Sequence, residues 1–121
     1  MKIAIVEDDD EIRSLLAITL TQKLGYPSPA LFTDGSTLVK AMAENGSNFD
    51  TIIMDYRMPE MSGIEAAKII KRHRPRTRII LATGYDVKDE AFRAGLLYLQ
   101  KPFSMEALAR ILSQERGSLM I

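Results

Sequence analysis

The sequence contains no cysteine, only one histidine and no long uninterrupted apolar run. Without cysteine, neither a disulfide framework nor a thiolate metal site can form. No stretch approaches the roughly 18 apolar residues of a membrane-spanning helix, and the apolar start of the chain is too short for a signal peptide. These absences argue against a disulfide-stabilised secreted protein and against a membrane protein. We therefore expect a cytoplasmic protein.

The 121 residues are enough for one domain and leave no room for a second folding unit. Apolar residues make up 46% of the chain, so a core can form without disulfide or metal cross-links. The formal net charge is zero, although acidic residues dominate the first half and basic residues the second. A balanced charge of this kind does not favour direct nucleic-acid binding.

Short apolar runs alternate five times with helical patterns along the chain. The runs predicted as strands are residues 2–6, 28–32, 51–55, 78–82 and 96–100. The predicted helices begin at Asp9 or Asp10, Asp34, Ser62, Val87 and Ser104 and end near Gly25, Gly46, Arg74, Ala94 and Gly117. Such alternation requires crossover connections and predicts a parallel sheet with helices on both faces. Residues 1–117 form the predicted domain, and residues 118–121 form a C-terminal tail.

Local signals define several of these elements. Ser62 followed by Glu65 has the spacing of a capping box at a helix start. Prolines 27 and 29 cannot donate to a β-ladder, so the second strand should lie at an edge of the sheet. Apolar residues at helical spacing predict the inner stripe of the first helix. These residues are Ile12, Leu15, Leu16, Thr19, Leu20 and Leu24.

The third apolar run ends abruptly in Asp55. A short run that is apolar throughout is typical of a strand buried on both faces of a parallel sheet. Open α/β sheets bind their ligands beyond the carboxyl ends of such strands. Asp55 is therefore the first candidate for a functional residue.

Other polar residues also follow strand ends, and parallel strands bring these ends to one edge. Glu7 and Asp8 follow the first strand, Thr83 the fourth and Lys101 the fifth. If the strand order is 2-1-3-4-5, the first and third strands are neighbours.

The carboxylates of Glu7, Asp8 and Asp55 would then lie close together. At 4 Å, each pair of carboxylates repels by on the order of 4 kcal/mol at an effective dielectric near 20. Oxygen ligands without histidine or cysteine favour Mg²⁺, and lysine and hydroxyl groups suit a phosphoryl group.

The motifs occur in a characteristic order along essentially the whole chain. They are Glu7-Asp8, Asp55-Tyr56-Arg57-Met58-Pro59, Thr83-Gly84, Tyr98 and Lys101-Pro102-Phe103. This set resembles the motif set of the response-regulator receiver domain of two-component signalling. The resemblance implies a flavodoxin-like α/β fold, a doubly wound five-stranded parallel sheet in the order 2-1-3-4-5.

The resemblance also implies a role for each acidic residue. Asp55 would be phosphorylated by a histidine kinase or a histidine phosphotransfer protein. Glu7, Asp8 and Asp55 would hold Mg²⁺ together with the backbone carbonyl of Arg57. The protein would be a signalling protein rather than an enzyme, catalysing at most its own phosphorylation and dephosphorylation.

Three further roles follow from the same resemblance. Lys101 would contact the phosphoryl group, and its bond to Pro102 is expected to be cis. Thr83 would swing toward the phosphoryl oxygens, and Tyr98 would be the switch aromatic. Phosphorylation would then change binding to an unidentified downstream protein.

The sequence departs from the family pattern in two respects. Lys101 follows Thr83 after only 18 positions, so the fourth helix and its loop should be shortened. No effector domain follows the last helix, so the chain is expected to act alone by docking to a partner. Whether the usual output surface is retained, and whether the protein forms a homodimer, stays open.

Two alternatives remain. One is a receiver-like interaction module that works without phosphorylation, which the shortened fourth helix favours. The other is a phosphohydrolase with an aspartate nucleophile, but such enzymes use a second acid where this chain has Arg57. In the favoured interpretation, the bulky side chains of Arg57 and Tyr85 flank the path of attacking water. They therefore predict a slowly hydrolysing acyl phosphate.

Overall fold

The computed structural model describes residues 1–44 and 46–114. Its five strands form one parallel sheet in the order β2-β1-β3-β4-β5. The strands are β1 (Ile3–Val6), β2 (Ala30–Phe32), β3 (Thr51–Asp55), β4 (Arg78–Thr83) and β5 (Leu97–Gln100). The predicted α/β architecture and strand order are confirmed.

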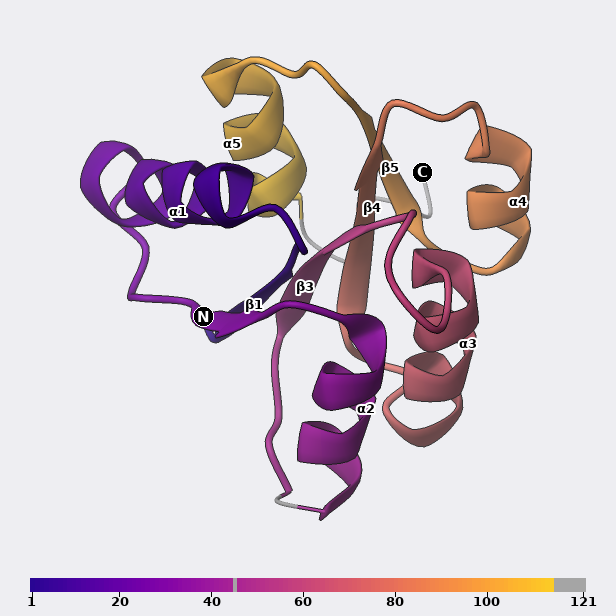
Figure 1. The fold of residues 1–121 in the computed structure, drawn as a ribbon. Coiled ribbons are helices and arrows are strands. Elements are labelled where there is room, and N and C mark those ends of the chain that lie inside the picture. Colours follow the sequence, from indigo (N-terminus) through magenta and orange to yellow (C-terminus); the bar gives the residue numbers. More distant parts are fainter. Residues whose placement is uncertain (45, 115–121) are drawn as a thin grey trace.

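Helices cover both faces of this sheet (Figure 1). They are α1 (Asp10–Ile18), α2 (Gly35–Glu44), α3 (Gly63–His73), α4 (Lys88–Arg93) and α5 (Met105–Ser113), with a π-helical turn η1 (Thr19–Lys23) after α1. Helices α1 and α5 lie on one face, and α2, α3 and α4 lie on the other. Within the described ranges, no helix combines the length and the apolar character needed to cross a membrane.

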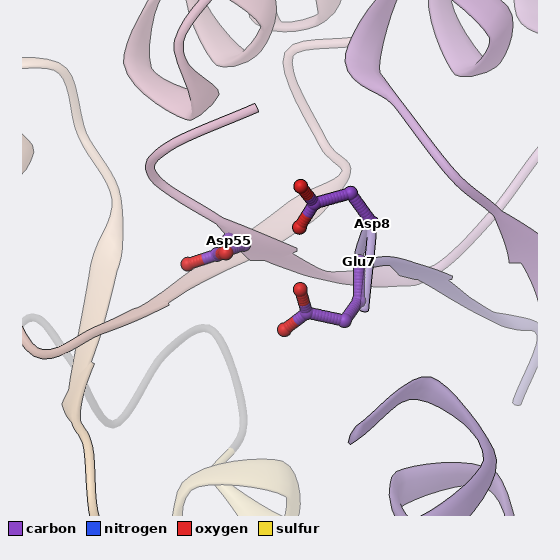
Figure 2. Close-up of side chains that lie close together, drawn as sticks. All are labelled: Glu7, Asp8 and Asp55. Atoms are coloured by element: carbon purple, nitrogen blue, oxygen red, sulfur yellow. The ribbon is translucent and has the colours of Figure 1, made fainter. Parts of the chain in front are cut away.

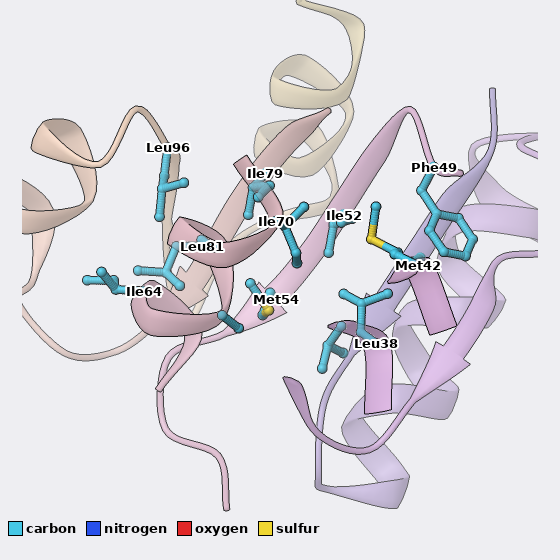
Figure 3. Close-up of a cluster of buried hydrophobic side chains, with 14 of the residues drawn as sticks. Leu38, Met42, Phe49, Ile52, Met54, Ile64, Ile70, Ile79, Leu81 and Leu96 are labelled. Carbon is cyan, nitrogen blue, oxygen red and sulfur yellow. The ribbon is translucent and has the colours of Figure 1, made fainter. Parts of the chain in front are cut away.

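The central strand β3 is buried on both faces, as its apolar run predicts. Ile52 and Met54 point into the cluster under α2 and α3, which Figure 3 shows. Ile53, between them in sequence, points into the cluster under α1 and α5. Because successive side chains of a strand alternate, β3 supplies both cores and fixes Asp55 at their common edge.

Side-chain hydrogen bonds confirm four of the five predicted helix starts. Asp9 caps α1 by accepting from the backbone N–H of Ile12 at 3.0 Å. Ser62 and Glu65 form the reciprocal capping box of α3. Asp34 accepts from the N–H of Thr37 at 2.8 Å, and Ser104 accepts from the N–H of Ala107 at 3.0 Å. Each cap satisfies a backbone donor that has no partner inside its helix.

The first helix differs from the prediction in two ways. The α-helix ends at Ile18 and continues as a π-helical turn, in which the N–H of Leu24 donates to the carbonyl of Thr19. The predicted inner stripe is also wrong in its first half, because Ile12 and Leu15 are 43% and 66% exposed. Leu20, in the π-helical turn, is the fully buried member of the stripe.

Two other element boundaries are corrected. The edge strand β2 is confirmed in position but starts at Ala30, after Pro29, which has no N–H for the ladder. Helix α5 ends at Ser113 rather than near Gly117, and Gln114 is extended. The guanidinium of Arg78 donates to the carbonyls of Leu112 and Gln114, which satisfies acceptors that a longer helix would use. Gly117 and the predicted tail 118–121 lie outside the described residues.

The fourth helix is short, as the spacing between Thr83 and Lys101 predicts. It has six residues and starts at Lys88 without a side-chain cap. Ala91 is fully buried and fixes it to the core, and Gly95 follows with φ +77°. The short helix is compatible with the complete five-stranded sheet.

Candidate functional site

Three carboxylates meet at the carboxyl ends of the neighbouring strands β1 and β3. Val6 pairs with Met54 in the parallel ladder, so the residues that follow, Glu7 and Asp55, lie beside each other. One oxygen each of Glu7, Asp8 and Asp55 lies within 4.8 Å of the others. Figure 2 shows Glu7 and Asp8 directed toward Asp55 from the adjacent segment. The structure thus brings the three predicted acidic residues together.

The cluster combines negative charge with partial burial. Glu7 is only 4% exposed, the Asp55 side chain is 16% exposed, and Asp8 faces solvent. Burial raises the pKa of Glu7, and the negative charge of Asp55 raises it further, although a hydrogen bond from Lys101 opposes the shift. A divalent cation at this edge would relieve the repulsion. Because all side-chain donors are carboxylate oxygens, the site fits Mg²⁺.

Lys101 provides the positive charge of the site. Its Nζ donates to Oε1 of Glu7 at 2.9 Å and lies 3.6 Å from Oδ1 of Asp55. Burial alone lowers the pKa of Lys101, but the hydrogen bond to Glu7 and the charge of Asp55 outweigh burial and raise it. The side chain therefore stays protonated beside Asp55. The bond between Lys101 and Pro102 is cis, as predicted.

Thr83 and Tyr98 are linked through the backbone of Tyr85. Thr83 is 1% exposed, and its Oγ1 accepts from the N–H of Tyr85 at 3.1 Å. The hydroxyl of Tyr98 donates to the carbonyl of Tyr85 at 2.6 Å. The loop between β4 and α4 thus connects the two predicted switch residues. This link was not predicted from the sequence, although Tyr85 stands two positions after Thr83, the spacing of a hydroxyl-to-backbone turn.

Arg57 connects the loops that follow β3 and β4. Its Nη1 donates to Oη of Tyr85 at 3.2 Å, and its guanidinium carbon lies 5.2 Å from the centre of the Tyr85 ring. The ring of Tyr56 lies 5.8 Å from the same ring. These contacts cluster bulky side chains beside the strand end that carries Asp55.

Arg13 also supports the site, a role that was not predicted from the sequence. Its Nη1 donates to the backbone carbonyl of Glu7 at 2.8 Å, and its guanidinium pairs with Asp10. The carboxylate of Glu7 also accepts from the N–H of Asp9 at 3.2 Å. These bonds hold the turn between β1 and α1. The spacing of Asp10 and Arg13, three residues apart on a helix, was the available signal.

Comparison with known proteins agrees with this geometry. Residues 3–113 match the family described as the response regulator receiver domain. The chain is 31% identical over 114 residues to Chemotaxis protein CheY of Pseudomonas aeruginosa, covering 89% of this chain and 90% of that protein. It is 34% identical over 117 residues to Regulatory protein AtoC of Escherichia coli (strain K12), covering 93% of this chain. The chain spans only about a quarter, 24%, of the length of AtoC.

Comparison with solved structures agrees with the sequence comparison. Chemotaxis protein CheY4 of Vibrio cholerae matches with a TM-score of 0.79 at 31% identity, covering 92% of this chain and 94% of that one. The two chains therefore share the same fold over nearly their whole length. On the family match, the relatives and the fold together, the chain belongs to the response regulator receiver domain family.

Proposed function

We propose that Asp55 accepts a phosphoryl group from a phosphohistidine of a histidine kinase or a histidine phosphotransfer protein. The observation that carries this proposal is the meeting of Asp55 with Glu7, Asp8 and Lys101 at one edge of the sheet. The family supports a phospho-accepting role in two-component signalling. The protein would act as a signalling switch in a phosphorelay.

The chemical step needs one nucleophile and one fixed positive charge. An oxygen of the Asp55 carboxylate forms a bond to phosphorus as the phosphorus–nitrogen bond of the phosphohistidine breaks. The leaving imidazole nitrogen keeps the electron pair of the broken bond. Lys101, whose Nζ is 3.6 Å from Asp55 Oδ1, would stabilise the negative charge on the transferred oxygens.

The acidic cluster would hold Mg²⁺ through Glu7, Asp8 and Asp55, with the backbone carbonyl of Arg57 as a further ligand. When bound, the ion would neutralise charge between the carboxylates and the phosphoryl oxygens. Glu7 serves two partners in this arrangement, since its other contact is the ammonium group of Lys101. It would therefore fix the distance between the metal site and Lys101.

Phosphorylation would be transmitted through the loop between β4 and α4. A phosphoryl group on Asp55 would attract the hydroxyl of Thr83, which now accepts from the N–H of Tyr85. Tyr98 is bound to the carbonyl of that same residue. A shift of the loop would thus change the position of Tyr98 and the surface of α4 and β5. We propose that a downstream protein binds according to the state of this surface.

Labelling with a small phosphodonor tests the proposal. Acetyl phosphate with Mg²⁺ should add the mass of one phosphoryl group. The Asp55→Asn variant should not gain it, and the control Asp86→Asn, which removes an exposed carboxylate after β4, should. Absence of any mass gain would contradict the proposal and favour an interaction module that works without phosphorylation. Repeated turnover of a simple phosphate ester would instead favour the phosphohydrolase.

A further inference from the structure

Helices α2 and α3 lie side by side on one face of the sheet (Figure 1), and a groove of about 320 Å³ opens between them near their C-terminal ends. Met42 and Ile70 form its floor and belong to the buried cluster that Figure 3 shows. The half-buried side chains of Val39 and Ile69 form its sides. Ala43, which is exposed, has only a methyl group at the rim. The α2–α3 groove is therefore apolar inside and accessible from the surface.

Positively charged side chains gather at one end of the α2–α3 groove. His73 and Arg74 line it, and further basic residues lie in the last turns of α3 or directly after it. These are Lys68, Lys71, Arg72 and Arg76. Arg72, Arg74 and Arg76 form no ion pair with any other residue that the structure describes. The end of a helix carries only about half a negative charge, so this cluster exceeds what the dipole of α3 balances.

The shape of the α2–α3 groove fits side chains of another protein. Pockets for whole small molecules begin at about 300 Å³ and enclose most of their ligand, so this groove is at their lower limit. A membrane surface binds apolar side chains that protrude, and no large apolar side chain of α2 or α3 is exposed. Single-stranded nucleic acids stack on aromatic side chains, and none is among the described residues that line the groove.

The α2–α3 groove lies away from the acidic cluster. Helix α2 precedes β3 and helix α3 precedes β4, so the C-terminal ends of both helices lie at the amino edge of the sheet. Asp55 ends β3 at the opposite, carboxyl edge. A molecule in the groove would therefore leave Asp55 accessible to a phosphohistidine.

We propose that the α2–α3 groove binds an acidic amphipathic segment of a partner protein. An apolar side chain of the segment enters the groove, and neighbouring carboxylates pair with Arg72 and Arg74. Because few side chains are buried and the ion pairs face solvent, binding is expected at micromolar concentrations and should weaken with added salt. Binding is independent of phosphorylation of Asp55, so it would hold the partner in place in both signalling states.

Labelled synthetic peptides test the chemistry of the partner. The probes are helical peptides in which one Leu, Met or Phe is flanked by glutamates, and fluorescence anisotropy measures their binding. Replacing the glutamates by glutamines, or the apolar residue by alanine, should weaken binding roughly tenfold. Absence of binding by every peptide at several hundred micromolar would overturn the proposal. So would equal binding of the alanine peptide, because it would indicate attraction between charges alone.

Substitutions in the protein test the location. Ala43→Phe should fill the groove from its rim, and Arg74→Glu should repel the acidic peptide, each weakening binding roughly tenfold. The matched controls are Ser14→Phe on α1 and Arg110→Glu on α5, both exposed positions on the opposite face of the sheet. Circular dichroism would verify that all four variants are folded. A loss of binding in Arg110→Glu as large as that in Arg74→Glu would contradict binding at the groove.

His73 provides a direct signal, because it lines the groove and is the only histidine in the sequence. The peptide should shift the NMR signals of its ring protons to the same extent in wild type and in Asp55→Asn. Binding that leaves these signals unchanged, or that requires acetyl phosphate, would overturn the proposal. Shifts caused by phosphatidylserine vesicles but by no peptide would replace the partner protein with a membrane. Shifts that follow protein concentration without peptide would replace it with a second copy of the chain.

Discussion

Gly63, the first residue of α3, packs directly against the backbone of Asp55. A β-carbon at this position would stand 2.2 Å from the Asp55 carbonyl oxygen and 2.8 Å from Cδ1 of Leu81. The N–H of Gly63 also donates to the carbonyl of Tyr56 at 2.7 Å. The absence of a side chain at one residue thus lets α3 close onto the end of β3 and determines where the proposed nucleophile lies.

We predict that Gly63→Ala destabilises the protein by roughly 1–3 kcal/mol, the usual cost of forcing an extra methyl group into a packed site. It should also slow phosphorylation, because the backbone of Asp55 must move. The measurements are urea unfolding and the rate of labelling by acetyl phosphate. Gly84→Ala is the matched control, since its nearest contact would be an ordinary 3.8 Å. Equal stability of the two variants would show that the close approach at Gly63 is not maintained.

Asp34 is expected to make the free energy of unfolding depend on pH. Hydrogen bonds from the N–H of Thr37 and the hydroxyls of Ser36 and Thr37 lower its pKa to about 2, from 3.8. Since the folded-state pKa is the lower one, this stabilisation is present above about pH 4 and is lost as the pH falls toward 2. Asp34→Ala should therefore cost about 1 kcal/mol of unfolding free energy at pH 6.

The difference between wild type and Asp34→Ala should shrink progressively below pH 4. Urea unfolding at a series of pH values measures it. Asp34→Asn is the control, because it retains an acceptor for the Thr37 N–H but has no carboxyl group to titrate. A difference that stays constant down to pH 2 would contradict the assignment to Asp34.

At the scale of helices and strands, the sequence predicted best what depends on local chemistry. The caps at Asp9, Ser62 and Ser104 were predictable because a short polar side chain satisfies nearby N–H groups wherever the helix lies. The convergence of Glu7 with Asp55 was predictable because parallel strands place their carboxyl ends on one edge. The caps depend on one helix end alone, and the convergence of strand ends is a general property of parallel sheets.

The packing of individual side chains between helices and loops was not predictable. Apolar periodicity assigned Ile12 and Leu15 to the inner face of α1, but periodicity does not reveal whether another helix covers that face. A pattern based on 3.6 residues per turn also cannot predict the π-helical turn after Ile18. The bond between Tyr98 and the Tyr85 carbonyl depends on the path of a loop. Local sequence carries little information about such paths.

The two loops that carry Arg57 and Tyr85 lead to a prediction about the phosphorylated state. These side chains contact each other through a hydrogen bond and a cation–π interaction. We expect the pair to restrict the approach of water to the neighbouring Asp55 more than either residue alone would. We expect Arg57→Ala and Tyr85→Ala each to accelerate hydrolysis of the acyl phosphate several-fold.

The double variant should hydrolyse little faster than the faster single variant, because either substitution already breaks the contact. Decay is measured by intact mass after removal of the phosphodonor. Lys88→Ala, at an exposed position of α4, is the control. Unchanged decay in both single variants would remove the proposed shielding role.

At the scale of the whole molecule, positive and negative charges are distributed unevenly. Acidic residues gather around the strand ends at residues 7–11, whereas basic residues gather at the end of α3 and in the loop after it. Although the net charge is zero, the carboxylates around Asp55 repel one another locally. This repulsion should destabilise the protein without metal and be relieved by a cation.

We predict that Mg²⁺ stabilises the folded protein and that Asp8→Asn reverses the order of stability. Ligand binding to the folded state alone adds about 2.7 kcal/mol at a concentration 100 times the dissociation constant. Asp8→Asn removes one negative charge from the cluster, so it should be more stable than wild type in EDTA. It also removes a proposed metal ligand, so it should gain much less from Mg²⁺ and become the less stable protein at saturation. Thermal unfolding across a Mg²⁺ titration measures both effects, with Asp86→Asn as a control that should follow wild type. Parallel titration curves for wild type and Asp8→Asn would contradict metal binding at this cluster.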